Sequence, residues 1–119
     1  MNFRVYNLEK KEVSQVYSLE EVLVSGVRLA KNKYALIVML GTGEFDTSGK
    51  EIFEGDFAKN ELGEHGCISY SNGEFWLGYF DEPAKQALST FKEHGKNTTL
   101  TLTGIIRSFI NEQYRYDKK

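Results

Sequence analysis

The sequence contains a single cysteine, Cys67, and a single proline, Pro83, among its 119 residues. One cysteine excludes an internal disulfide framework and any metal site built from several thiolates. The sequence has no run of 18 apolar residues, so we expect no membrane-spanning helix. The first residues, 1–6, lack the apolar stretch of a signal peptide, so we expect a cytoplasmic protein.

What the chain does contain is enough apolar material for one core. Hydrophobic residues make up 40% of the sequence and aromatic residues 13%, which excludes an intrinsically disordered chain. A chain of this length supports one domain. We therefore expect a single domain over residues 1–119, with a polar, frayed tail over residues 111–119.

Charge is distributed unevenly along the chain. The formal net charge is -2, but residues 44–64 carry seven carboxylates against Lys50 and Lys59, a local net charge of -5. No basic stripe of the kind that neutralises phosphates is present, so nucleic-acid binding is disfavoured. The acidic segment suits a basic protein surface instead.

A hairpin centred on Asn72-Gly73 is the clearest local pattern, because this dipeptide favours a two-residue type I′ turn. The register then pairs Ile68 with Leu77 and Ser69 with Trp76. Alternation assigns to the core face Ile68, Tyr70, Phe75, Leu77 and Tyr79. Trp76 falls on the more polar face.

Two short helices are predicted beside the strands. Ser18 and Glu21 have the spacing of a capping box, which predicts a helix over 19–25. Asp81 as a cap, Pro83 in the first turn and apolar residues at helical spacing predict a second helix over 84–94.

The remaining strands are short and bounded by turn residues. We expect them at 3–6, 12–17, 34–40, 51–53, 57–59 and 98–103, with tight turns at Gly49 and Gly55 and a bulge at Gly104. The most apolar of these, 34–40, is expected to be a buried central strand. Strands and helices do not alternate as in βαβ units. The sequence predicts a mainly β fold, a small antiparallel SH3-like barrel or partly open barrel with two short helices.

A motif in the middle of the chain resembles the signature of the YopX family of small bacteriophage and prophage proteins. It consists of Thr42-Gly43, Asp46 and the run 49–57, Gly-Lys-Glu-Ile-Phe-Glu-Gly-Asp-Phe. Residues 3–6 and 102–106 resemble the opening hairpin and the closing strand of the family. The resemblance implies a mostly β fold and a phage or prophage origin, and hence the cytoplasm of a bacterial host. It implies no activity and supplies no catalytic residue.

Catalytic patterns are not found in the sequence. Gly49-Lys50-Glu51 lacks the hydroxyl residue and the glycine spacing of a phosphate-binding loop. His65 and Cys67 lie two residues apart without the third group that would orient a nucleophile pair. The carboxylates lack the spacing of a calcium-binding loop. We therefore predict a protein that is not an enzyme and that has no metal site and no cofactor.

The leading hypothesis is a non-enzymatic interaction module that engages a host or phage protein. The candidate partner-binding residues are Glu44, Asp46, Glu51, Glu54, Asp56 and Trp76. The first five supply acidic charge, and tryptophan is a frequent hot-spot residue. Two alternatives are a nucleic-acid-binding small β-barrel and an inhibitor of a host defence nuclease that uses the acidic surface. Self-association into a homo-oligomer is left open.

Overall fold

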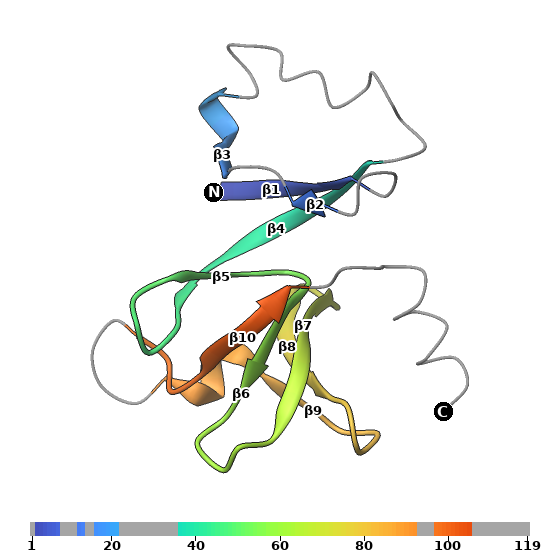
Figure 1. The fold of residues 1–119 in the computed structure, drawn as a ribbon, viewed down its shortest axis with the longest axis vertical. Helices are drawn as coiled ribbons and strands as arrows, with labels where there is room; N and C mark the ends of the chain where they lie inside the picture. Colours follow the sequence, from blue (N-terminus) through green and yellow to red (C-terminus); the bar gives the residue numbers. More distant parts are fainter. Residues whose placement is uncertain (1, 8–11, 14–15, 22–35, 93–96, 106–119) are drawn as a thin grey trace. The chain divides into compact units, whose positions relative to one another are not determined.

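The computed structural model describes residues 2–7, 12–13, 16–21, 36–92 and 97–105 (Figure 1). The described residues up to Leu40 form one compact unit, and Gly41–Ile105 forms a second. The prediction of one domain over residues 1–119 stays a prediction. Within the described part of the chain, no helix is long and apolar enough to cross a membrane.

The first unit is a small antiparallel sheet. It contains β1 (Asn2–Asn7), β2 (Glu12–Val13), β3 (Tyr17–Ser18) and the first half of β4 (Leu36–Phe45). β1 pairs with all of the others, with Tyr6 opposite Val13 and Phe3 opposite both Tyr17 and Leu40. These pairs confirm the predicted opening hairpin. The Glu21 amide donates to Ser18 Oγ at 3.1 Å, as the capping box predicts, and residues 22–25 lie outside the described residues.

Burial in β4 follows the alternation of a strand with one covered face. Met39 is fully buried, whereas the neighbouring Val38 is 44% exposed. Successive side chains of a strand point to opposite faces. The expectation of a strand buried on both faces is therefore wrong at Val38. The strand also continues through Gly41 and Gly43, past the predicted end at residue 40.

The second unit contains a curled antiparallel sheet that forms a half-barrel, and beside it the pairing of the second half of β4 with β5. After the second half of β4 it contains β5 (Glu51–Phe53), β6 (Asp56–Lys59), β7 (His65–Ser71), β8 (Glu74–Tyr79), β9 (Lys85–Ala87), the short helix η2 (Leu88–Phe91) and β10 (Thr101–Ile105). Five of these strands form a sheet in the order β10-β6-β7-β8-β9 (Figure 1). The mainly β class is confirmed, with the curled sheet corresponding to the partly open barrel.

The β7–β8 hairpin has the predicted register throughout. Asn72 and Gly73 have φ of 52° and 77°, as a type I′ turn requires, and Ile68 lies opposite Leu77. Ile68 and Leu77 are buried, but Tyr70 is 45% exposed. The core prediction is wrong at Tyr70, which lies near the tip of the hairpin opposite Phe75. There the Tyr70 ring packs on Phe75 with centroids 4.8 Å apart.

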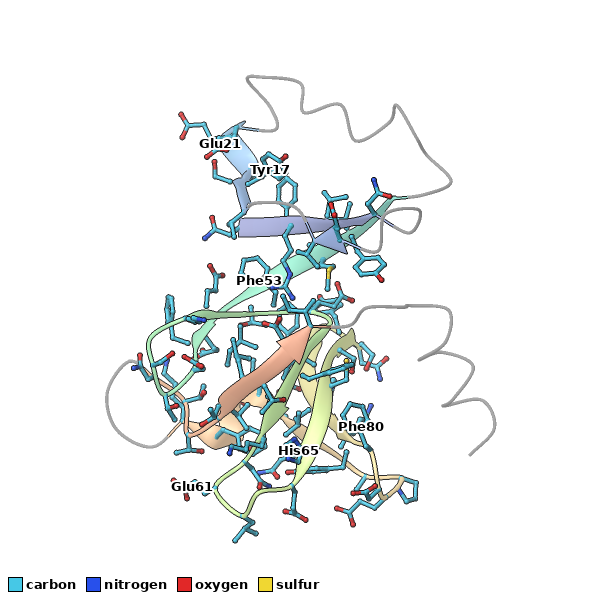
Figure 2. All side chains as sticks on the ribbon, viewed as in Figure 1. Tyr17, Glu21, Phe53, Glu61, His65 and Phe80 are labelled. Carbon is cyan, nitrogen blue, oxygen red and sulfur yellow. The ribbon has the colours of Figure 1, made fainter. Side chains whose placement is uncertain are left out.

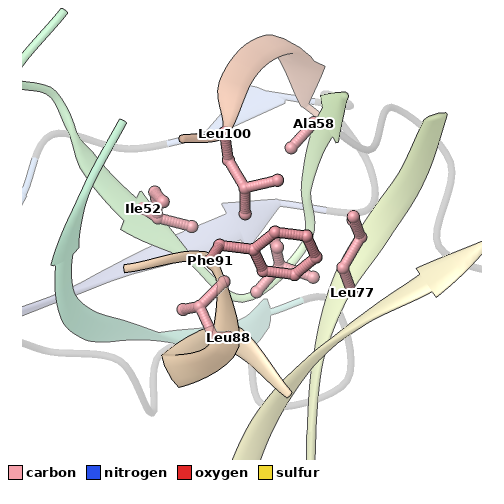
Figure 3. Packing of buried hydrophobic residues seen from close by; sticks show 7 residues of the cluster. Ile52, Ala58, Leu77, Leu88, Phe91 and Leu100 are labelled. Atoms are coloured by element: carbon pink, nitrogen blue, oxygen red, sulfur yellow. The ribbon is translucent and has the colours of Figure 1, made fainter. Parts of the chain in front are cut away.

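One cluster of buried side chains fills the second unit (Figure 3). Its members come from five strands or their flanks and from η2: Ile52, Ala58, Ile68, Leu77, Leu88, Phe91 and Leu100. Phe75, Tyr79 and Leu102 pack against it while keeping part of their surface exposed. The sheet and the short helix are therefore held together by one shared core.

The second predicted helix is wrong over most of its length. Lys85–Ala87 forms β9, and only Leu88–Phe91 is helical, as a single 3₁₀ turn. β9 pairs with β8 through Gly78 opposite Lys85 and Trp76 opposite Ala87, so strand pairing overrides the helical pattern. Leu88 and Phe91 are still buried, as that pattern required. Residues 93–94 of the predicted helix lie outside the described residues.

The predicted glycine positions are confirmed. Gly49 and Gly55 have φ of 90° and 87°, a region that favours glycine. The pairing of β10 with β6 shifts register between Leu102 and Gly104, which is the predicted bulge.

Candidate functional site

The first predicted acidic residue, Asp46, is directed into the protein and is only 3% exposed. Its Oδ1 accepts hydrogen bonds from the amides of Ser48 and Lys50 and from Ser48 Oγ, at 2.8–2.9 Å. Its Oδ2 accepts from the Leu102 amide at 3.3 Å, which ties this turn to β10. Burial alone would raise the pKa of Asp46, but these hydrogen bonds outweigh it and hold the pKa below its ordinary value.

Asp56 is also buried, with 1% of its surface exposed. Its Oδ2 accepts from the Phe53 amide at 2.7 Å across the tight turn at Gly55. The carboxylates of Asp46 and Asp56 therefore organise turns and contribute little exposed surface. Their partner-binding role stays a prediction, and the geometry gives both a structural one.

Glu44, Glu51 and Glu54 are half-buried. Glu44 Oε2 lies 3.3 Å from Lys92 Nζ in an ion pair, and Glu51 Oε2 accepts from the Gly43 amide at 3.3 Å. The charge of Glu44 is thus partly neutralised within the protein. Within the described residues, no three His, Cys, Asp or Glu side chains are placed to hold a metal ion.

Trp76 is half-buried on β8, and its indole is engaged within the unit. Nε1 donates to the Ser71 carbonyl at 3.1 Å, and Lys85 Nζ lies 4.3 Å from the ring centroid. This is a cation–π contact from the neighbouring strand β9. The lysine covers part of the face that the sequence left for a partner.

A five-residue loop between β6 and β7, Asn60–Glu64, is more exposed to solvent than the acidic residues described above. Figure 2 shows Glu61 on this loop. The Asn60 side chain holds the loop, since Oδ1 accepts from the amides of Leu62 and Glu64 at 3.0 and 2.9 Å. Nδ2 donates to Glu64 Oε1 at 2.8 Å. Backbone bonds join Asn60 to Glu64 and Gly63, and Gly63 has a φ of 81°. The loop therefore has a fixed conformation.

Leu62 at the centre of this loop is 84% exposed, the highest value among the large apolar side chains described. Beside it lies an open pocket of about 270 Å³. The loop contributes Asn60, Glu61, Leu62 and Glu64 to its lining, and the rest comes from Gln86, Thr90, Phe91 and Thr99. Among the described residues, the lining contains two carboxylates and no basic side chain. An apolar group and a negative charge thus occur together at one hollow.

Hydrogen bonds connect the residues that line this pocket. Asn60 Nδ2 donates to the Tyr79 hydroxyl at 3.2 Å, and that hydroxyl donates to Gln86 Oε1 at 2.9 Å. Gln86 Nε2 then donates to Thr90 Oγ1 at 2.9 Å, and Thr90 Oγ1 donates to the Ala87 carbonyl at 2.7 Å. This polar chain links the Asn60–Glu64 loop to β8, β9 and η2. The pocket is consequently formed before any ligand arrives.

A comparison with known protein families identifies the chain. The model of the family described as "YopX protein" matches residues 2–102. The chain belongs to the YopX family. No curated protein matches the chain.

Contacts within the protein give a structural role to several residues of the motif that resembles the YopX signature. Thr42 Oγ1 donates to the Ile52 carbonyl at 2.7 Å and accepts from the Glu44 amide at 3.0 Å. Asp46 and Asp56 accept amide hydrogen bonds in the two turns that follow. In this YopX chain the motif therefore specifies how β4, β5 and β6 connect.

The pocket beside Leu62 was missed by the sequence reasoning, which included Glu61 and Glu64 only as part of the acidic segment 44–64 and named none of the other lining residues as a contact surface. One signal was present, because Asn60-Glu61-Leu62-Gly63 has the Asx-x-x-Gly spacing of Asp46-Thr47-Ser48-Gly49. The links from Asn60 to Tyr79 and from Tyr79 to Gln86 join residues distant in sequence. No local pattern encodes them.

Proposed function

We propose that this YopX-family chain is a phage- or prophage-derived accessory protein that binds a protein partner in the bacterial cytoplasm and catalyses no reaction. Family membership supports the origin. The surface of the Asn60–Glu64 loop supports the mode of action. The partner is a host or phage protein.

The observation that carries this proposal is the exposure of Leu62 on a loop with a fixed conformation. A single exposed leucine is common on protein surfaces. Here, however, side-chain and backbone hydrogen bonds hold the loop that presents it. A loop whose backbone is already ordered loses little conformational entropy on binding, which favours a protein contact through its exposed leucine.

We move the acidic part of the proposed contact surface to Glu61 and Glu64. Asp46 and Asp56 are buried, whereas Glu61 and Glu64 are exposed and border the pocket. Glu61 and Glu64 belong to the same acidic segment, 44–64, that the sequence singled out. We assign partner contact to Leu62, Glu61 and Glu64. Glu44, Glu51, Glu54 and Trp76 are left as a secondary surface.

Photo-crosslinking in bacterial cells tests this proposal. The full chain is produced with p-benzoylphenylalanine in place of Leu62, and a control carries it in place of Glu74, which is exposed on the β7–β8 hairpin. We expect a crosslinked protein from position 62 and none from position 74. Absence of a species specific to position 62, or a crosslink only to a second copy of the chain, would overturn the proposal.

The identity of the crosslinked protein tests the narrower alternative, in which the partner is a host defence nuclease. A nuclease at position 62 would favour inhibition of a host defence enzyme, and any other protein would favour a different target. Retention of DNA or RNA at low salt in a gel shift would instead favour the nucleic-acid-binding alternative.

A further inference from the structure

We propose that the pocket beside Leu62 receives an arginine side chain of the protein partner. This inference rests on the proposed function, because it specifies what the same surface recognises. It assigns a ligand chemistry to the pocket lined by the Asn60–Glu64 loop, Gln86, Thr90, Phe91 and Thr99.

The size of the pocket fits one side chain. Pockets for drug-sized molecules typically begin at about 300 Å³. At about 270 Å³ and open to solvent, this pocket lies just below that range. An inserted side chain can enter from the open side while its own backbone stays on the surface.

The charge of the lining selects a cation. Glu61 and Glu64 are both exposed, and the described residues of the lining include no lysine, arginine or histidine. Glu64 Oε1 accepts from Asn60 Nδ2, so the carboxylate is oriented, and among the described residues no donor contacts Oε2. An oriented carboxylate with one uncommitted oxygen matches the donors of a guanidinium. Nucleic acid, which is itself anionic, is disfavoured at this pocket.

The apolar parts of the lining select a long side chain rather than a small cation. Leu62 is exposed at the rim, and Phe91 lines the pocket as part of the buried cluster. The methylene groups of an arginine pack on apolar surface while the guanidinium contacts carboxylates. The planar guanidinium also presents donors in a fixed geometry, which the compact ammonium of lysine lacks. We therefore assign arginine.

The pocket is held in its binding geometry by the hydrogen-bonded chain through Tyr79. The Tyr79 hydroxyl links Asn60, which orients Glu64, to Gln86, which is held in turn by Thr90. Tyr79 is a positioning residue, because it acts on Glu64 through Asn60. Preformed sites lose less free energy to ordering when a ligand binds.

The test uses three short peptides and the full chain labelled with ¹⁵N. The peptides are acetyl-Ala-Arg-Ala-amide and its counterparts with lysine or citrulline, the uncharged analogue of arginine. We expect the arginine peptide to bind with a dissociation constant on the order of 1 mM, a value typical of a single weak contact. Its amide shift changes should cluster at Leu62, Glu64 and Thr90. The citrulline peptide should bind about tenfold more weakly, because it lacks the charge-assisted contact.

Two double variants with the same change of charge isolate the pocket. Glu61→Gln with Glu64→Gln removes both carboxylates and keeps an oxygen that can accept from Asn60. Glu74→Gln with Glu82→Gln removes two exposed carboxylates outside the lining. We expect about tenfold weaker arginine-peptide binding in the first variant and no change in the second. The dispersion of the amide spectrum verifies that each variant is folded, and Glu61→Gln alone serves if the double variant is not.

Three outcomes would overturn the inference. These are equal binding of the arginine and citrulline peptides, equal binding of the lysine peptide, or equal weakening by both double variants. Failure here is separate from failure of the proposed function. A protein crosslinked at position 62 with no arginine-specific shifts would retain the interaction surface and remove the assignment of arginine.

Discussion

The turn at Asp46 and the loop at Asn60 have the same hydrogen-bond pattern and different surfaces. In each, the first side chain accepts from the amides two and four residues later, at 2.9–3.0 Å. In each, the first and fifth residues share a backbone bond, and a glycine with positive φ occupies the fourth position. The second unit thus contains one local structure twice.

The two loops differ at the third position. Ser48 returns its hydroxyl to Asp46 Oδ1 at 2.8 Å, so it contributes to the turn. Leu62 has 84% of its surface exposed, so burial does not account for its apolar side chain. Since the Asp46 turn forms with serine at this position, the backbone does not require leucine. The identity of residue 62 is therefore open to selection for binding.

The second polar atom of the first side chain, Oδ2 in Asp46 and Nδ2 in Asn60, also has different partners in the two loops. Asp46 Oδ2 is directed inward to the Leu102 amide, whereas Asn60 Nδ2 is directed to Glu64 and Tyr79. The Asp46 carboxylate therefore bonds to β10, whereas the side-chain amide of Asn60 positions residues at the pocket. Acidic residues in a sequence therefore do not by themselves define an acidic surface, because buried carboxylates serve as acceptors for backbone amides.

The largest expected effect comes from Gly66→Ala, which would disrupt the strand pairing that supports the Asn60–Glu64 loop. A Cβ on Gly66 would lie 2.9 Å from both the Gly78 carbonyl carbon and Leu77 Cδ1. Overpacking of this kind costs roughly 3 kcal/mol of unfolding free energy. Urea unfolding measures it. Gly78→Ala is the control, because its Cβ would have its nearest neighbour at 3.8 Å and should have a clearly smaller effect.

A smaller loss is expected from Asp46→Asn, by about 2 kcal/mol at pH 7, because the amide nitrogen cannot accept from backbone donors. The pKa of Asp46 is lowered in the folded protein, so its stabilisation is complete above the unfolded pKa of about 4. It is lost as pH falls through the folded value. Urea unfolding from pH 7 to pH 3 should show the gap between wild type and variant shrinking. Exposed Asp81→Asn is the control, and a gap independent of pH would contradict the assignment.

Local sequence patterns predicted the parts of the fold that depend on neighbouring residues. Asn72-Gly73 fixed the register of β7 with β8, and Gly104 marked the bulge in β10. The pattern at 84–87 predicted a helix, but Lys85–Ala87 pairs with β8 as a strand. That pairing joins residues whose partner cannot be read from their own spacing.

The candidate site was harder to predict than the fold. Charge counts placed it on Asp46 and Asp56, but each of these carboxylates accepts at least one amide hydrogen bond and is buried. The pocket depends on the contact of Asn60 with Tyr79, 19 positions away. Alternation placed Tyr79 on the core face and gave no information on its hydroxyl. Only the three-dimensional structure supplies that contact.

Tyr79→Phe tests the bond that distinguishes the Asn60–Glu64 loop from the Asp46 turn. The variant keeps the ring that packs on the core and removes the hydroxyl between Asn60 and Gln86. We expect a loss of about 1 kcal/mol in unfolding free energy, the usual value for one hydrogen bond. Amide exchange at Leu62 and Glu64 should also become faster. Tyr70→Phe, which removes a hydroxyl from an exposed tyrosine, should change neither, and equal effects of the two would contradict the role of the Tyr79 hydroxyl.

The smallest effect on stability is expected from exchanging the third residues of the two loops. Leu62→Ser removes an apolar side chain that is already in water, so the unfolding free energy should change by less than about 0.5 kcal/mol. Ser48→Leu removes the hydroxyl bond to Asp46 and should cost about 1 kcal/mol. Thermal unfolding measures both. If Leu62→Ser destabilised the protein as much as Ser48→Leu does, the Leu62 side chain would stabilise the fold, which would contradict its assignment as an exposed residue available to a partner.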